Sequence, residues 1–361
     1  MKIKICFVAP KAYPLFNPTV TGVFGGSEVD LYYLATELAR DGDFQVSFVV
    51  ADYGQAATEV SSGVTLIKSL SPGSNPIIGA WRVWQALQRA DSQFYMLKTA
   101  SPGTPLVAYF CRRYDRKFVY RTANSRECDG DYLRRHRLLG RAFAWSLRQA
   151  ELVLAQSRDD AENLLRTVGV AAKVIPNGHR LTIIEQERNR DIILWAGRSA
   201  VFKRPELFID LADSMRQQQF VMICQRATGD SHYDKLIERA RPMKNLDFIS
   251  RVPFHEIDSF FQRARVLVNT SDSEGFPNTF IQACKCATPI LSLGVDPDGF
   301  LGRHRCGICC MGEIRRLKET LEYMLENDRC VELGRNGLEY ARQHHDITEV
   351  ARQYKKLFVT L

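Results

Sequence analysis

Short apolar segments alternate with amphipathic segments through the first half of the chain. The apolar segments predict buried β-strands over residues 3–8, 46–50, 94–97, 118–121, 152–156 and 173–175. Helices are expected over residues 27–40, where apolar side chains recur at helical spacing, and over 80–89, 138–148 and 158–168. Strands separated by helices predict a parallel, doubly wound sheet.

The same alternation begins again after a polar stretch over residues 183–190, which is predicted to be a linker. Strands are expected over 191–196, 220–224, 246–249, 266–269 and 289–293, and helices over 205–215, 233–240, 257–264, 278–286, 315–327, 330–344 and 348–359. The fold class is therefore α/β, with two Rossmann-like, doubly wound domains over 1–182 and 190–345. We expect them to face each other across a ligand-binding cleft, and a C-terminal helix in 346–361 to pack back on the first domain.

Composition agrees with a two-domain globular protein, since the chain has 361 residues, of which 45% are hydrophobic and 25% charged. No apolar run reaches the ~18–20 residues of a membrane helix. The basic, then apolar start is too short for a signal peptide and predicts the first strand instead, so a cytoplasmic protein is expected. The cysteines at Cys284-x-Cys286 and Cys306-x-x-Cys309-Cys310 lack the paired spacing of a zinc site, and no metal is predicted.

Positive charge is concentrated in residues 111–150, which hold eleven Lys and Arg against four Asp and Glu. This segment is either a solvated helix surface or a contact for an anionic membrane or a phosphate-bearing acceptor. Nucleic acid is not expected, because no interleaved aromatic residues or known binding module accompany the charge.

Three loops carry candidate chemistry. The first, Gly22-Val23-Phe24-Gly25-Gly26-Ser27-Glu28, follows the first strand and opens a helix. Its glycines allow close approach of the backbone to a ligand, and helix N-terminal amides favour an anion. The loop is not G-x-G-x-x-G, which disfavours a nicotinamide dinucleotide; a plain tight turn is the alternative.

The second loop, Gly197-Arg198-Ser199-Ala200-Val201-Phe202-Lys203-Arg204-Pro205, follows the first strand of the second half. Arg198 and Lys203 can converge there on a diphosphate, since arginine offers a planar fork and lysine a point charge. A solvent-exposed basic loop is the alternative.

The third stretch, Ser273-Glu274-Gly275-Phe276-Pro277-Asn278-Thr279, joins a buried strand to a helix, and Gln282 lies one turn into that helix. A carboxylate beside free backbone amides suits a sugar followed by phosphates at the helix N-terminus. A helix-capping acid is the alternative.

Together the three loops resemble the retaining glycosyltransferases of family 4, which have the GT-B fold. The resemblance covers almost the whole chain and includes Val174-Ile175-Pro176-Asn177-Gly178 and Cys306-Gly307. It implies an acceptor-side first domain, a nucleotide-sugar-binding second domain, and transfer of a sugar from a donor such as a UDP- or GDP-sugar to a saccharide or lipid-linked acceptor in cell-surface glycan synthesis. It implies no metal and no cofactor.

The resemblance also implies roles for residues. Arg198 and Lys203 bind the donor diphosphate and stabilise the leaving group, and Glu274 bonds a hydroxyl of the donor sugar; these three are the candidate catalytic residues. The substrate-binding candidates are Gly25, Gly26, Gly275, Phe276, Pro277, Asn278, Thr279 and Gln282. With the basic segment, a lipid-linked acceptor implies a location in the cytoplasm or peripherally at the inner membrane face.

Two positions depart from the family pattern. Gln282 occupies the place of a second glutamate that accepts bonds from ribose, so weaker donor binding or a changed nucleotide preference is expected. The run after the strand at 118–121 lacks a histidine, and Asn124 or Glu127 is the candidate in its place. A non-catalytic nucleotide-sugar-binding protein and a sugar-nucleotide epimerase are the alternative functions.

Overall fold

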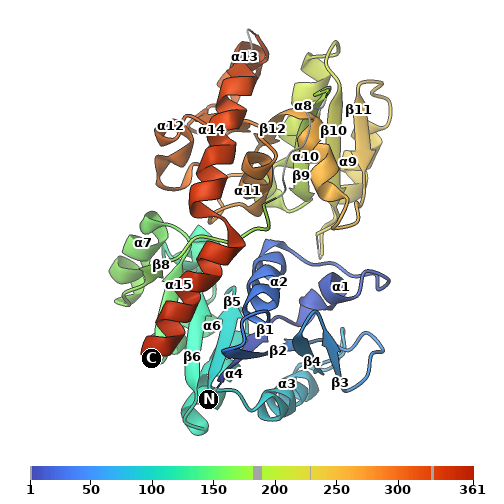
Figure 1. The fold of residues 1–361 in the computed structure, drawn as a ribbon. Coiled ribbons are helices and arrows are strands. Elements are labelled where there is room, and N and C mark those ends of the chain that lie inside the picture. Colours follow the sequence, from blue (N-terminus) through green and yellow to red (C-terminus); the bar gives the residue numbers. More distant parts are fainter. Residues whose placement is uncertain (1, 182–188, 228, 327–328) are drawn as a thin grey trace. The chain divides into compact units, whose positions relative to one another are not determined.

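The computed structural model describes residues 2–181, 189–227, 229–326 and 329–361 (Figure 1). The chain divides into two compact units, one formed by residues 1–180 with 346–361 and the other by 181–345. Most of the predicted linker over 183–190 lies outside the described residues. Each unit contains a doubly wound α/β sheet, as predicted.

The first unit contains an eight-stranded sheet in the order β3-β4-β2-β1-β5-β6-β7-β8. Neighbouring strands are parallel except at the edge, where β3 pairs with β4 in the antiparallel sense. The strand order reverses between β1 and β5. The strands are β1 (Ile3–Val8), β2 (Phe44–Val50), β3 (Thr58–Ser61), β4 (Val64–Lys68), β5 (Phe94–Lys98), β6 (Lys117–Arg121), β7 (Leu152–Ala155) and β8 (Lys173–Val174).

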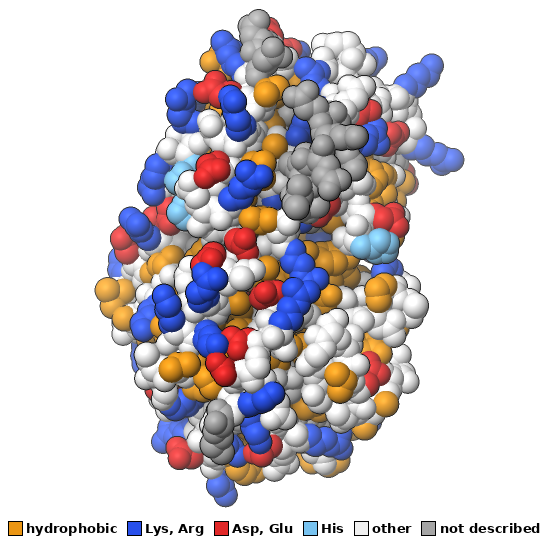
Figure 2. Space-filling view, in the orientation of Figure 1, with side chains coloured by type: hydrophobic (Ala, Val, Ile, Leu, Met, Phe, Trp, Pro, Cys, Tyr) orange, Lys and Arg blue, Asp and Glu red, His pale blue; other side chains and the backbone are white. Residues whose placement is uncertain are grey.

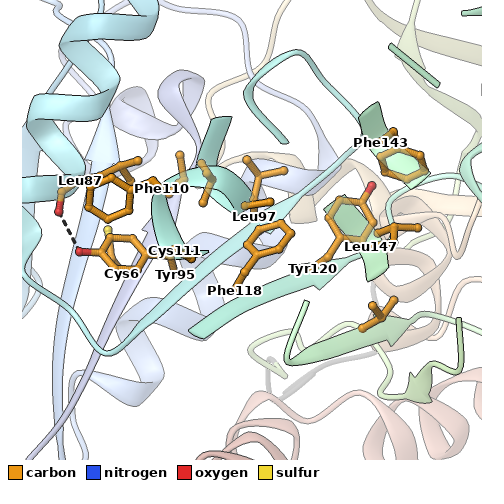
Figure 3. Close-up of a cluster of buried hydrophobic side chains, with 14 of the residues drawn as sticks. Cys6, Leu87, Tyr95, Leu97, Phe110, Cys111, Phe118, Tyr120, Phe143 and Leu147 are labelled. Atoms are coloured by element: carbon orange, nitrogen blue, oxygen red, sulfur yellow. Dashed lines mark hydrogen bonds between the residues drawn. The ribbon is translucent and has the colours of Figure 1, made fainter. Parts of the chain in front are cut away.

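Helices cover both faces of this sheet. On one face, α2 (Gly26–Leu38) packs beside α15 (Ile347–Thr360), whose Phe358 contacts Phe94 of β5. Alternate residues of the same strands point to the other face, where Tyr95, Leu97, Phe118 and Tyr120 form one apolar cluster with the helices (Figure 3). Those helices are α3 (Pro76–Ala90), α4 (Gly103–Arg113), α6 (Arg137–Arg148) and α7 (Arg158–Val168). The short helices α1 (Tyr13–Phe16) and α5 (Asp131–Arg135) complete the unit.

The β3–β4 hairpin was missed by the hydrophobic pattern. Its two-residue turn is Ser62-Gly63, and both residues have positive φ, 52° and 78°. A turn of this kind matches the twist of the strands it joins and favours glycine. The Ser-Gly pair was therefore the local signal for the hairpin. The strand β3 itself is mostly polar and so lacks the apolar pattern from which strands were predicted.

The second unit contains a six-stranded parallel sheet in the order β11-β10-β9-β12-β13-β14. Its strands are β9 (Ile192–Arg198), β10 (Phe220–Gln225), β11 (Leu246–Ile249), β12 (Ala264–Asn269), β13 (Ile290–Ser292) and β14 (Gly307–Cys309). Its helices are α8 (Pro205–Ser214), α9 (Tyr233–Ala240), α10 (Ile257–Arg263), α11 (Asn278–Lys285), α12 (Phe300–Arg303), α13 (Ile314–Leu325) and α14 (Arg329–His344). The order reverses between β9 and β12, and ligands of doubly wound sheets bind at the carboxyl ends of strands at such a reversal.

No helix in the described part of the chain is both long and apolar enough to cross a membrane. All ten cysteines are free thiols; eight are buried, and Cys309 and Cys330 are partly exposed.

Candidate functional site

The loops that follow β9 and β12 are joined at the reversal of the second sheet. Thr270 Oγ1 donates to the carbonyl of Lys203 at 2.7 Å and accepts from Trp195 Nε1 at 3.0 Å. The backbone N–H of Asp272 donates to the carbonyl of Phe202 at 2.8 Å. Two sequence-distant loops are thus held as one surface, and these loops carry Arg198, Lys203 and Glu274.

Lys203 and Glu274 form a direct ion pair in this surface. The Ser271 hydroxyl also donates to Glu274 Oε1, at 2.7 Å, and Ser271 is itself bonded to Asn269. The paired side chains are only 15% and 12% exposed, so the carboxylate is oriented rather than free to rotate. The sequence predicted a role for each charged residue separately, but neither their pairing nor the contact of Ser271. The only local signal for Ser271 was its place after a buried strand.

Arg198 and Gln282, like Thr279, have polar side chains for which the described residues supply no partner. Arg198 ends β9 and is half-buried, yet its guanidinium group forms no hydrogen bond or ion pair with any described residue. Gln282 lies one turn into α11, is half-buried, and its amide group has no partner in the described part of the chain. Both can therefore bind a ligand without first breaking an internal contact.

The N-terminus of α11 adds backbone donors to the same region. Pro277 is the N-cap and has no N–H, and the helix begins at Asn278. Among the residues that the structure describes, the N–H groups of Gly275 and Thr279 have no acceptor. The ring of Phe276 anchors the loop, since it packs 5.0 Å from Phe300 and 4.9 Å from the ring of His345. Free amides at a helix N-terminus favour an anion such as a phosphate.

The glycine loop of the first unit is hydrogen-bonded to the start of the helix that follows it, α2. Glu28 Oε2 accepts from the N–H of Gly25 at 2.8 Å and from the Ser27 hydroxyl at 3.0 Å, which forms a capping arrangement at the start of α2. Gly26 is the first residue of the helix. Gly25 has φ −125°, an extended conformation open to any residue, so a left-handed turn does not explain its glycine.

The first unit also contains a buried network of charged side chains that the sequence did not predict. Asp30 of α2 accepts from Lys98 Nζ at 2.8 Å and from Arg121 Nε at 2.9 Å. Arg121 also donates to Asn177 at 2.7 Å and to the Tyr354 hydroxyl of α15 at 2.7 Å. Burial alone would raise the pKa of Asp30, but the charges of Lys98 and Arg121 outweigh it and hold the pKa below its usual value. The network joins helix, sheet and C-terminal helix of the first unit.

Asn124 and Glu127, the candidates for the position of the absent histidine, form hydrogen bonds within the first unit. Glu127 is buried, and its carboxylate accepts from the N–H groups of Ala100 and Ala123 and from the Tyr120 hydroxyl. Burial raises its pKa despite these bonds. The Asn124 side chain accepts from the N–H of Arg126 and caps a short 3-10 turn. Both residues hold the loops after β5 and β6 in place.

Comparisons with known proteins identify the family of the chain. Residues 24–182 match the family described as Glycosyltransferase Family 4, and residues 182–344 match the family described as Glycosyl transferases group 1. An uncharacterized glycosyltransferase of Methanocaldococcus jannaschii is 24% identical over 211 residues. That match spans 56% of this chain and 57% of the relative.

Solved structures with low sequence identity share the fold. A sucrose-phosphate synthase from Thermosynechococcus elongatus superimposes with a TM-score of 0.79 at 17% identity, covering 100% of both chains. WaaG, a glycosyltransferase involved in lipopolysaccharide biosynthesis, gives 0.72 at 15% identity, with 98% and 99% of the two chains covered. A trehalose-phosphate synthase from Burkholderia xenovorans gives 0.74 at 12% identity, with 99% and 100% covered.

Proposed function

Because this chain belongs to the family 4, group 1 glycosyltransferases, we propose that it moves a sugar from a nucleotide diphosphate to a hydroxyl of a saccharide or lipid-linked acceptor. The anomeric configuration is retained, and the product is a cell-surface glycan. The reaction takes place on the cytoplasmic side, at or near the inner face of the membrane.

The observation that carries this proposal is the arrangement at the β9/β12 reversal. A carboxylate held by Lys203 lies in the same joined loops as Arg198 and as the backbone N–H groups of Gly275 and Thr279, for which the described residues supply no partner. The carboxylate suits the hydroxyls of a sugar, whereas the cations and amides suit the two phosphates. A nucleotide sugar offers both kinds of group, since its sugar is followed directly by two phosphates.

Lys203 can serve both partners at once. Its ammonium group has three protons, and the bond to Glu274 uses one of them. The remaining protons can be donated to the donor phosphates, while the Glu274 carboxylate accepts from a sugar hydroxyl in this proposal. As the glycosidic bond breaks, negative charge grows on the leaving diphosphate, so Arg198 and Lys203 act mainly on rate.

The departing phosphate takes the proton of the acceptor hydroxyl, which attacks from the same face of the sugar. Glu274 is bound to Lys203 and Ser271, which suits it to hold the sugar rather than to attack it. The cations supply the charge that a divalent metal supplies in other transferases, so activity is expected to persist in EDTA. Gly25 and Gly26 contact the acceptor in this proposal, and Gln282 accepts from ribose.

A screen of nucleotide sugars by thermal shift tests the donor site. We expect one donor to raise the melting temperature of the wild-type chain and of Arg239→Ala, a surface control whose partner is Asp210. The shift should disappear in Glu274→Ala and Lys203→Ala. A donor whose shift survives in both variants would place its site elsewhere.

Incubation of the identified donor with acceptor candidates, followed by NMR of the anomeric proton, tests the reaction. A product with the donor's anomeric configuration supports retention. A donor that binds and is never consumed supports the non-catalytic alternative, and return of a different stereoisomer on the nucleotide supports an epimerase.

A further inference from the structure

Three helices on one face of the first unit contain no acidic residue. They are α3, α4 and α6, and they cover the sheet through one shared apolar cluster. α3 lies beside α4, where Trp84 packs 5.1 Å from Phe110, and α4 lies beside α6. We call the solvent-facing side of these three helices the outer basic face.

The arginines of this face are not neutralised by the protein. α3 and α4 carry two each and α6 carries three: Arg82, Arg89, Arg112, Arg113, Arg137, Arg141 and Arg148. Within the described chain none of them forms an ion pair with a carboxylate; Arg82 bonds a serine hydroxyl, Arg112 a glutamine and Arg148 a backbone carbonyl. In the second unit several exposed arginines are paired with carboxylates, for example Arg216, Arg263 and Arg305, although others such as Arg315 and Arg335 form no ion pair within the described residues.

Large apolar side chains are exposed between these arginines. Leu138 is 81% exposed, Ile77 80%, Trp81 59% and Tyr109 54%. Helix α3 already buries Val83, Ala86 and Leu87 against the sheet, so Ile77 and Trp81 form a second apolar surface on its outer side. Large exposed apolar side chains on the same helices as unpaired arginines are not needed for the fold of this unit.

A glycine fixes the position of Leu138. A Cβ on Gly140 would lie 2.8 Å from the Leu133 backbone, so only glycine permits the close packing of α5 against α6. The tight turn at His136 holds Leu138 and Leu139 in the first turn of α6, beside Arg137 and Arg141. The exposed leucines are thus held on a regular helix.

We propose that the outer basic face docks the protein on an anionic phospholipid surface. The arginines contact lipid phosphates, while Ile77, Trp81, Tyr109 and Leu138 enter the head-group region. Cations combined with aromatic and aliphatic side chains, without acids, are the composition of interfacial membrane-binding surfaces. A nucleic acid would match the charge but not the aliphatic side chains, and a protein partner would match the apolar side chains without needing every acid to be absent.

This surface differs from the basic segment that the sequence suggests. Within residues 111–150, Arg121 is fully buried, Arg116 pairs with Asp91, and Arg135 pairs with Asp131. Helix α3 lies outside the segment and contributes Ile77 and Trp81. Membrane contact therefore depends on helix packing, since three helices separate in sequence supply the surface.

The proposal deepens the proposed function, since it implies that the acceptor is reached at a membrane, but its test is independent of donor chemistry. The full chain is mixed with vesicles of phosphatidylcholine containing about a third phosphatidylglycerol, and with pure phosphatidylcholine vesicles, and bound protein is measured by sedimentation. We expect binding to the anionic vesicles only, weakened by salt. Each arginine removed should weaken it about fivefold.

Two variants test the charged and the apolar contributions to vesicle binding separately. Arg112→Gln/Arg137→Gln/Arg141→Gln removes charge, and Trp81→Ser/Leu138→Ser removes apolar contact. Arg216→Gln/Arg263→Gln/Arg305→Gln is the matched control, with the same charge change in the second unit. The first should lose binding at least a hundredfold, the second at least tenfold, and the control should stay within about fivefold. Unchanged melting temperatures and donor shifts in all three show intact folds.

The proposal would be overturned if the variants of the outer basic face bound anionic vesicles as well as the control variant does. It would also be overturned if the wild type did not bind vesicles. Binding to vesicles that is displaced completely by RNA, or sedimentation without vesicles that Leu138→Ser abolishes, would show another occupant and overturn it too. Failure of the donor screen with intact vesicle binding would reject the enzymatic proposal and leave this one standing.

Discussion

Each unit of this protein pairs a lysine with a carboxylate at the carboxyl end of its central strands, but the two pairs differ in their surroundings. In the first unit, Lys98 and Asp30 are 2% and 4% exposed, and Arg121 completes the contacts of the carboxylate. In the second, Lys203 and Glu274 are partly exposed, and their loops also carry the Arg198 side chain and the Gly275 and Thr279 N–H groups, which have no partner among the described residues.

The difference separates a structural pair from a ligand-binding pair. Asp30, Lys98 and Arg121 are bonded to one another and to Asn177 and Tyr354, and they are shielded from any solute. The Lys203–Glu274 pair keeps some exposure to solvent, 15% and 12% of the two side chains, and the bond to Glu274 uses only one of the three ammonium protons of Lys203. Burial with complete pairing specifies the fold, whereas incomplete pairing near solvent leaves binding capacity.

Breaking the buried network should have the largest effect. Arg121→Met removes one hydrogen-bond donor each from Asp30, Asn177 and Tyr354, although Lys98 still contacts the first two. The loss of one partner of a buried ion pair costs about 3–5 kcal/mol. Urea denaturation followed by the fluorescence of the first unit's tryptophans measures this loss. Arg216→Met, which breaks an exposed pair with Asp213, should cost under about 0.5 kcal/mol. Similar costs for both would contradict the structural role.

Breaking the second pair should lower activity without lowering stability. Lys203→Ala is expected to reduce kcat about 10²–10³-fold, since the lost cation stabilises charge that grows only in the transition state. Its unfolding free energy should stay within about 1 kcal/mol of wild type, because both partners keep some access to water. Steady-state kinetics and urea denaturation on the same samples measure both. A parallel loss of stability and activity would make this pair structural as well.

The pH dependence of stability should also distinguish the pairs. Burial lowers the pKa of Lys98 to about 8, although Asp30 opposes the shift. Between about pH 8 and the ordinary pKa of lysine, 10.5, the unfolded chain therefore binds more protons than the folded chain. Stability of the wild type should rise across this range relative to Lys98→Met, by at most about 3 kcal/mol.

The comparison of slopes matters here, because Lys98→Met also removes contacts and lowers stability at every pH. Lys355→Met is the control, because Lys355 pairs with the carboxylates of Asp41 and Asp43 at the surface. Hydrogen bonds to these carboxylates raise the pKa of Lys355 rather than lower it, so this variant should keep the wild-type slope in this range. A wild-type slope that Lys98→Met leaves unchanged would show that Lys98 is not the titrating group.

Adding charge at Gln282 should have the smallest effect. Gln282→Glu gives the ribose hydroxyls a charged acceptor, and charge-assisted hydrogen bonds are roughly twice as strong as neutral ones. We expect donor affinity to increase up to about tenfold in calorimetry, or about 1.4 kcal/mol. A deoxyribose donor should show a smaller gain; an equal gain would place Gln282 away from the ribose.

Much of the fold followed from local patterns. The helix predicted over 158–168 has the predicted bounds, because Ser157 caps its first turn and Gly169, with φ +72°, ends it. The alternation of strands and helices correctly gave two doubly wound sheets. Helix α4 was missed because its Gly-Thr-Pro start resembles a loop, and the packing of Val107, Phe110 and Cys111 against the sheet overrides that signal.

The loops that carry charge, glycines and a carboxylate can be located in the sequence alone, because those residues adjoin strands that hydrophobic periodicity identifies. Which of these residues contact one another depends on the folded chain. Glu274 reaches Lys203, 71 residues away, because β9 and β12 are neighbours at the reversal of strand order. Arg121 reaches Tyr354, 233 residues away, because α15 belongs to the first unit. Such contacts depend on strand order and helix packing, which are properties of the whole chain and leave no local pattern at either residue.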